Sequence, residues 1–254
     1  MTRAKLVSAA MHLGTSSAPL PVSCTSVALC EEIFFYLLIL MYVTEKIKER
    51  HLKLYRAAVK GDWVIAEGII KNNVDDIRAK ISQVGNTVLH IAAAASHTRF
   101  VQELVQKYIT PEDLMMKNEE RNTAFVLAAA SGNMELVKFM MNMNKELSVI
   151  RCKEGRLPVQ IAALFGHEKI VRHLYKSTEN ELTDGDRTEL LVTLIDNSLY
   201  DTALQLLQQH GELATFRDEN GETALHALAR KPLTLSDLVN PNQQGILKRF
   251  FKQC

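Results

Sequence analysis

Apolar positions recur along most of the chain with a nearly constant period. Each period opens on an apolar residue, and two mostly small side chains follow three and four positions later. The opening residues are Leu54, Leu89, Phe125, Val159, Leu191 and Leu225, at spacings of 35, 36, 34, 32 and 34 residues. Periods of this length are typical of repeat proteins, whose units bury their apolar faces only by stacking. We therefore expect six stacked units within residues 50–232.

The pattern inside each unit predicts a short helix, a turn and a longer helix. Small pairs such as Ala92 and Ala93 allow two helices to approach closely. Seven residues after the opening residue stand Gly61, Ser96, Gly132, Gly166 and Ser198, at the place where a left-handed residue ends a helix. A second apolar stripe with helical i, i+3 spacing follows: Ala66 and Ile69, Val101 and Leu104, Val137 and Met140, Val171 and Leu174, and Ala203 and Leu206.

The start of each unit carries turn and capping signals. Threonines 87, 123 and 223 stand where a side-chain oxygen can cap the first helix. Glycines 85, 155 and 221 stand where a tight turn needs positive φ. Each unit therefore begins with a turn that leads into its short helix.

These residues resemble the ankyrin repeat, whose pattern is Gly-x-Thr-Pro-Leu-His-x-Ala-Ala followed by a glycine. The closest matches are Gly-Asn-Thr-Val-Leu-His-Ile-Ala-Ala at 85–93 and Gly-Glu-Thr-Ala-Leu-His-Ala at 221–227. The motif proline survives only as Pro158, and the fifth unit, 187–209, is the most degenerate. The resemblance implies an all-α solenoid in which His90 and His226 hydrogen-bond between neighbouring turns.

Residues 54–63 and 218–229 are also similar to plant ankyrin proteins that end in a Pro-Gly-Gly domain. These include the accelerated-cell-death and salt-tolerance ankyrin proteins. The resemblance implies a role in plant defence or stress signalling, with several membrane helices after the repeats. Because this chain ends at Cys254 without such helices, we expect a truncated chain, a short isoform or a gene fragment.

The regions outside the repeats divide into three parts. We expect a poorly ordered lead-in over 1–32, an apolar helix over 33–49 and a C-terminal tail over 233–254. The apolar run Ile33–Val43 has eleven residues, whereas a membrane span needs about twenty. We expect this helix to cap the first unit. The alternatives are a membrane anchor, with the repeats on the cytosolic side because basic residues follow it, and unnatural sequence from a mistaken start site.

Charge and cysteine content narrow the function classes. Thirty basic and twenty-nine acidic side chains give a net charge of +1, so no bulk field draws the chain to nucleic acid. The four cysteines form no Cys-x-x-Cys pair, which argues against a zinc or redox motif and favours a reducing, cytoplasmic location. The sequence contains no phosphate-binding loop, Gly-x-Ser-x-Gly elbow or His-Glu-x-x-His helix. We expect no enzymatic activity, cofactor or metal.

Other candidate groups are interpreted as structural. Histidines 167 and 173 are six residues apart in one helix, and we expect both to be solvated. The acidic pairs Asp75–Asp76 and Glu119–Glu120 lie in turns, where we expect hydrated carboxylates with ordinary pKa values. The single tryptophan, Trp63, is expected to pack in the core or at its edge, and the alternative is a contact with a partner.

Surface recognition remains as the expected activity. Partners of such solenoids meet the turn tips and the exposed side of the short helices. The candidate partner-binding residues are Gln83, Asn118, Glu119, Lys153, Glu154, Leu164, Phe165, Glu219 and Asn220. Positions five and six after each opening residue form a strip that is apolar at its centre, Leu164 and Phe165, and polar at its ends. The alternative for Phe165 is that it turns into the repeat stack.

We therefore expect a non-catalytic scaffold or adaptor that binds another protein through its concave face. Two alternatives stay open. One is a membrane-associated signalling protein anchored through residues 33–43, and the other is a truncated, non-functional fragment.

Overall fold

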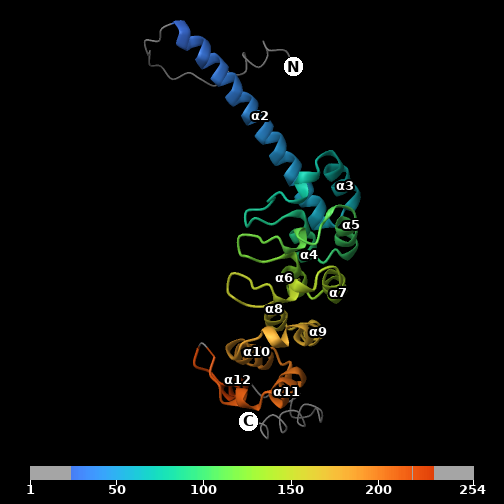
Figure 1. Ribbon diagram of the computed structural model, residues 1–254, viewed down its shortest axis with the longest axis vertical. Coiled ribbons are helices and arrows are strands. Elements are labelled where there is room, and N and C mark those ends of the chain that lie inside the picture. Colours follow the sequence, from blue (N-terminus) through green and yellow to red (C-terminus); the bar gives the residue numbers. More distant parts are fainter. Residues whose placement is uncertain (1–23, 219, 232–254) are drawn as a thin grey trace. The chain divides into compact units, whose positions relative to one another are not determined.

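The computed structural model describes residues 24–218 and 220–231 of the 254-residue chain (Figure 1). Within these ranges the regular structure is helical and contains no strand, only an isolated bridge between Lys117 and Thr123. The chain divides into two compact units, Met1–Glu49 and Arg50–Cys254. The helices are α2 (Cys24–Lys60), α3 (Trp63–Asn72), α4 (Val88–Ala94), α5 (Thr98–Tyr108), α6 (Ala124–Ala130), α7 (Met134–Met143), α8 (Pro158–Leu164), α9 (Glu168–Thr178), α10 (Asp184–Asp196), α11 (Tyr200–Gln209) and α12 (Ala224–Arg230).

Helix α2 is longer than the sequence pattern predicts. The expected helix over 33–49 begins instead at Cys24, and it continues without interruption through the opening residue of the first repeat. No glycine or proline occurs between residues 24 and 60, so nothing in this stretch ends a helix. Gly61, with φ of 71°, follows its last residue. The rest of the expected lead-in, residues 1–23, and the expected tail over 233–254 lie outside the described residues.

The second unit is a stack of helix pairs. Its inner helices α4, α6, α8, α10 and α12 pack against one another in chain order, and the helices α5, α7, α9 and α11 form an outer layer (Figure 1). Thr123 and Thr223 accept hydrogen bonds from the backbone N–H of Val126 and His226, which caps α6 and α12 as expected. The second helix of the sixth repeat would lie outside the described residues.

The periodic apolar residues form the core. The first five opening residues, Leu54 to Leu191, are at most 2% exposed. Leu225, in the last described helix, is 40% exposed. In α3 the fully buried residues are Ala66, as predicted, and Ile70, whereas Ile69 is only partly buried. The stacked core therefore follows the sequence period except at its ends.

Trp63 packs between the outer helices of the first two repeats, as expected. It is the first residue of α3, and its ring meets Phe100 edge-on at 5.3 Å between centroids. Tyr108 lies 6.3 Å away, and the ammonium group of Lys107 lies 5.4 Å from the indole ring. These contacts join α3 to α5.

Left-handed residues end the inner helices at the predicted positions. Gly61, Ser96, Gly132, Gly166 and Ser198 have φ between 59° and 78°. At two of these glycines, a side chain would also clash with a neighbouring histidine ring. A Cβ atom on Gly61 would lie 2.7 Å from the ring of His97, and one on Gly132 would lie 2.6 Å from the ring of His167. Each glycine thus lets a histidine of the next repeat lie against the turn.

Candidate functional site

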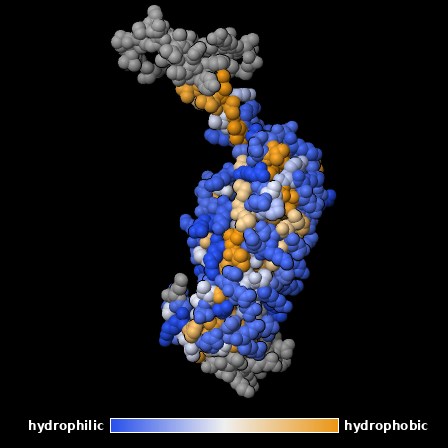
Figure 2. All heavy atoms as spheres, viewed as in Figure 1, coloured by the Kyte–Doolittle hydropathy of each residue, from blue (hydrophilic) through white to orange (hydrophobic). Residues whose placement is uncertain are grey.

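The C-terminal ends of the inner helices form a strip, and its apolar centre is exposed. Leu164 is 46% exposed and Phe165 is 58% exposed. The ring of Phe165 stacks on the imidazole of His167, with 6.4 Å between centroids and 15° between planes. The alternative that Phe165 turns into the repeat stack is therefore wrong. Figure 2 shows that such hydrophobic patches are small interruptions of a mostly hydrophilic repeat surface.

His167 supports this exposed centre. Its Nε2–H donates to the carbonyl oxygen of Ala130 in the preceding repeat, at 2.9 Å. His97 makes the equivalent bond to Val59, at 2.8 Å. The prediction that His167 is a solvated helix polar is wrong, because the ring bridges two repeats and lies against Gly132. His167 is the N-cap residue that precedes α9, and His173 within α9 is half-buried.

The C-terminal end of the strip is paired within the protein. The guanidinium of Arg230 lies 3.3 Å from both carboxylate oxygens of Asp196. The ammonium group of Lys231 also donates to the backbone carbonyl of Asp196. Arg230 and Asp196 thus pair with each other, whereas Leu164 and Phe165 present exposed apolar surface that a partner can cover.

Backbone hydrogen bonds hold three turn tips in a row. The N–H of Glu119 donates to the carbonyl of Val84 at 3.1 Å, and the N–H of Lys153 donates to that of Glu120 at 2.9 Å. The side chains of Gln83, Glu119, Lys153, Glu154 and Asn220 are exposed, as their predicted role requires. Glu219 lies outside the described residues.

Asn118 is a correction to the predicted site. It is only 6% exposed. Its amide nitrogen donates to Oδ1 of Asn86 at 2.8 Å, and its Oδ1 accepts from the backbone N–H groups of Glu120 and Asn122. An asparagine side chain that accepts hydrogen bonds from backbone N–H groups two and four residues later stabilises the turn that these residues form. Asn118 therefore holds the tip and cannot face a partner.

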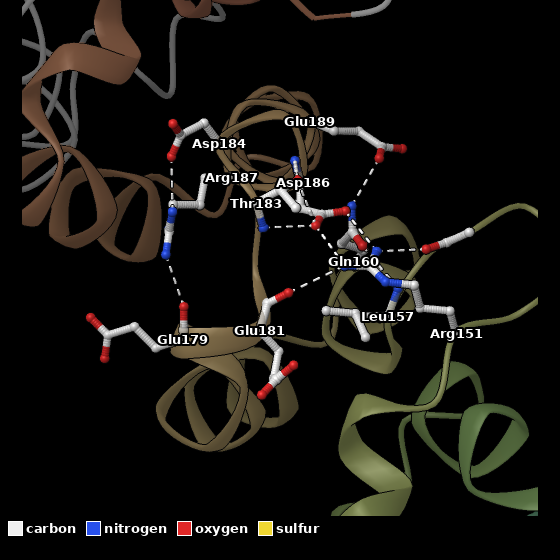
Figure 3. A network of polar contacts seen from close by, with 11 residues as sticks. Arg151, Leu157, Gln160, Glu179, Glu181, Thr183, Asp184, Asp186, Arg187 and Glu189 are labelled. Carbon is white, nitrogen blue, oxygen red and sulfur yellow. Dashed lines mark hydrogen bonds and ion pairs between the residues drawn. The ribbon is translucent and has the colours of Figure 1, made fainter.

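The fifth repeat has no turn tip, because α10 starts early. This helix has 13 residues, whereas α4, α6 and α8 have seven each. Two arginines of the fourth turn bind the extra turns (Figure 3). Arg151 forms a fork with Asp186 at 2.8 and 2.7 Å, and Arg156 bonds Glu189 at 2.7 Å. Gln160 donates to the other oxygen of Glu189 at 2.8 Å.

This fork perturbs Asp186 strongly. Burial alone would raise the pKa of its carboxyl group, but hydrogen bonds from Arg151 and Thr183 lower the pKa to about 2. The charged form is thus the one that the fold selects, and Arg151 and Asp186 tie the fourth repeat to the fifth.

Two further aspartates, Asp76 and Asp113, are buried. Asp76 is 2% exposed and accepts from Arg50 at 2.5 and 2.9 Å. Asp113 is 7% exposed and accepts from Arg78 at 2.6 and 2.9 Å. Burial opposes ionisation at both, yet these hydrogen bonds lower both pKa values. The expectation of a hydrated Asp76 with an ordinary pKa is wrong, because Arg50 on α2 donates the hydrogen bonds that water would otherwise donate.

A sequence signal for such forks exists. Arg78 and Asp113 are separated by 35 residues, and so are Arg151 and Asp186. That separation equals about one repeat, so the two partners occupy adjacent levels of the stack.

His90 has the structural role that the resemblance implies. It is 1% exposed, its Nδ1 lies 2.9 Å from Oγ1 of Thr87, and its Nε2 lies 3.0 Å from the carbonyl oxygen of Asn122 in the next repeat. Burial lowers the pKa of its imidazole. His226 contacts Thr223 in the same way at 2.8 Å. Among the described residues no three His, Cys, Asp or Glu side chains converge as a metal site would need, and no helix there is long and apolar enough to cross a membrane.

Comparison with known proteins agrees with this architecture. Residues 102–186 match the family described as "Ankyrin repeats (3 copies)", and residues 84–117 match "Ankyrin repeat". Mouse (Mus musculus) synphilin-1 is 26% identical over 182 residues, which cover 69% of this chain and 18% of the relative. The nuclear factor NF-kappa-B p105 subunit of Rattus norvegicus is 25% identical over 175 residues, 65% of this chain and 17% of the relative.

A plant protein also matches. The probable E3 ubiquitin-protein ligase XBOS32 of Oryza sativa subsp. japonica is 28% identical over 120 residues, 47% of this chain and 24% of the relative. The chain thus spans less than a quarter of the length of each of these three relatives. Repeats of this type generally bind other proteins and lack catalytic residues of their own. Residues 84–186 carry ankyrin repeats, and the part of the chain that the structure describes folds as an all-α ankyrin-repeat solenoid.

Proposed function

We propose that this protein is a non-catalytic adaptor that binds another protein through the inner-helix strip and the row of turn tips. The observation that carries the proposal is the exposure of Leu164 and Phe165 at the centre of the strip. Aromatic side chains are frequent anchors of protein interfaces, because they bury a large area with few rotatable bonds.

The surroundings of Phe165 support an anchor role. Its ring is oriented by His167, whose own position is fixed by the bond to Ala130. Little side-chain freedom is then lost when a partner covers the ring, which reduces the entropic cost of binding. The names of two relatives are consistent with a protein-binding role. A p105 subunit assembles with other proteins, and a ubiquitin-protein ligase acts on them.

The test is capture of partners from an extract of cells that express the tagged chain. The variants are Phe165→Ala and, as a matched control, Val64→Ala, since Val64 on α3 is 80% exposed but lies outside the strip. We expect Phe165→Ala to lose proteins that the wild type and the control both retain. Its melting temperature should be unchanged, because surface substitutions alter stability by only about 0.5 kcal/mol or less. Equal capture by all three proteins would contradict the proposal.

For the cellular role we propose plant defence or stress signalling in the cytoplasm. The resemblance to Pro-Gly-Gly ankyrin proteins supports the role, and the absence of Cys-x-x-Cys pairs supports the location.

The alternative is a membrane anchor, which the exposure of Leu40, Met41 and Tyr42 on α2, between 52% and 67%, favours. Alkaline carbonate extraction of membranes distinguishes the two. Retention of the full chain that is lost in Leu40→Glu/Met41→Glu would establish the anchor, and extraction of both would support the cytoplasmic location.

A further inference from the structure

A cleft of about 660 Å³ opens among α9, α10 and α11, away from the inner-helix strip. Its walls come from the two outer helices. Helix α9 contributes Arg172 and Lys176, and α11 contributes Thr202, Gln205, Gln208 and Gln209. The volume lies within the range of roughly 300–1,000 Å³ that ligand sites occupy.

The cleft has a cause in the sequence of the fifth repeat. Helix α5 packs against α7, and α7 packs against α9, whereas α9 and α11 touch only sparsely. Eleven residues after the opening residue, the second, third and fourth repeats place Phe100, Leu136 and Ile170, all at most 2% exposed. The fifth repeat places Thr202 there. A threonine fills less space than these side chains, so the outer helices do not close.

Arg172 spans this opening. Its Nε donates to Oγ1 of Thr202 at 3.2 Å, and its Nη2 donates to Glu168 at 2.6 Å. Because a guanidinium carries five N–H groups, Arg172 keeps donors for a further acceptor. The Arg172 side chain therefore links α9 to α11 across the cleft and places a positive charge in the cleft wall.

The remaining lining groups are available for a ligand. Lys176 forms no ion pair within residues 24–218 and 220–231, and the exposed glutamines of α11 form no side-chain hydrogen bonds there. Glu179 is the one acidic side chain in the described lining, against Arg172 and Lys176. Because Glu168 already pairs with Arg172, Lys176 is the cation of the described lining that a ligand carboxylate can pair with, beside amides that both donate and accept.

A third cationic side chain, that of Lys138, adds to this field. His173 also lines the cleft, and its neighbours Lys138 on α7 and Lys176 add to burial in lowering the pKa of its imidazole. A neutral imidazole can donate as well as accept a hydrogen bond. Cations on α7 and α9 thus concentrate on one side of the cleft.

We propose that this cleft binds an extended acidic peptide segment of a partner protein. Carboxylate side chains of the segment pair with Lys176 and accept from the remaining donors of Arg172, and its peptide groups bond the amides of Gln205, Gln208 and Gln209. Primary amides match a peptide group because each offers a donor and an acceptor. The outer-helix position makes this site independent of the inner-helix strip.

The experiment measures fluorescence anisotropy with the purified full chain and a fluorescein-labelled peptide of alternating Glu and Ala. The same peptide with Gln in place of Glu tests the charge requirement. The variant is Lys176→Glu, and the control is Lys169→Glu, an equal charge reversal at an exposed position of α9 outside the cleft. We expect the Glu peptide to bind at least about tenfold more tightly than the Gln peptide, since each lost charge-assisted bond costs about a factor of ten.

Lys176→Glu should weaken Glu-peptide binding by about tenfold or more, and Lys169→Glu should change it far less. Gln208→Ala should also weaken binding, whereas Phe165→Ala should not, which separates this site from the strip. Equal losses in Lys176→Glu and Lys169→Glu would show unspecific charge attraction and overturn the proposal, as would no binding at all. Tighter, Lys176-dependent binding of a single-stranded oligonucleotide would overturn it in favour of nucleic acid.

Discussion

Substitution of Gly132 by alanine tests the packing between repeats most directly. Gly132 ends α6 with φ of 78°, where any other residue costs about 1–2 kcal/mol. The lower entropy of the unfolded alanine chain returns about 0.4–1 kcal/mol of this. The new Cβ would also lie 2.6 Å from the imidazole of His167, so the ring must move.

Movement of that ring has its own cost. It breaks the bond from His167 to Ala130, worth about 0.5–1.5 kcal/mol, and disturbs the stacking on Phe165. We therefore expect Gly132→Ala to lower the free energy of unfolding by about 2 kcal/mol in all. Gly166 is the matched control, because its φ is 75° and no atom lies within 4 Å of its added Cβ. Gly166→Ala should cost only about 1 kcal/mol.

Urea unfolding followed by circular dichroism measures both values. The double variant Gly132→Ala/His167→Ala, compared with His167→Ala alone, removes the clash and leaves the backbone strain. In that background Gly132→Ala should cost only as much as Gly166→Ala in the wild type. If Gly132→Ala and Gly166→Ala are equally destabilising, or if removal of the imidazole brings no relief, the steric argument is refuted.

Three further predictions concern charge and turn strain. Asp186→Asn should destabilise the chain by about 1–2 kcal/mol at pH 7, after allowance for the partly exposed Arg151. Because the pKa of Asp186 is lowered to about 2, its contribution exists above its unfolded pKa near 4 and is lost as pH falls toward 2. Urea midpoints between pH 5 and 2 should therefore fall less in Asp186→Asn than in the wild type. The lowered pKa of buried His90 means that the unfolded chain binds the extra proton, so stability should drop as pH falls below about 6.5. His90→Asn should show less of this drop between pH 7 and 5.5, and an unchanged slope would contradict it. Arg121 is exposed with φ of 58° at a tip where other repeats have glycine, so Arg121→Gly should raise the urea midpoint by the equivalent of about 0.5–1 kcal/mol. A lower midpoint would show that the Arg121 side chain stabilises the tip.

The sequence was sufficient for features that repeat along one chain segment. Positive φ at Gly61 and its counterparts and the caps at Thr123 and Thr223 depend on residues within a single unit, and burial of Leu54 and its counterparts follows from the same period because like units stack. The misjudged residues Asp76, Asn118 and His167 depend on partners elsewhere. His167 and Asn118 contact the preceding repeat, and Asp76 contacts Arg50 on α2. Such contacts require knowledge of which residues face one another across levels, and hydrophobic periodicity carries no information on polar partners.

The fifth repeat departs most from the repeat sequence pattern, and it also contains the ion pairs to the fourth turn and the cleft beside α11. The opening residue of the fifth repeat follows that of the fourth by only 32 residues. The fifth repeat has no turn tip, and the first residues of α10 take the place that a tip occupies in other repeats. This extension presents Asp186 and Glu189 to the arginines of the fourth turn. The same repeat replaces an aliphatic core residue with Thr202, which leaves the cleft between α9 and α11. Stacked repeats contact only their neighbours, so a departure in one unit is confined to its two interfaces. The regular repeats on either side can therefore keep their packing while the fifth supplies a binding cleft that a uniform array would close.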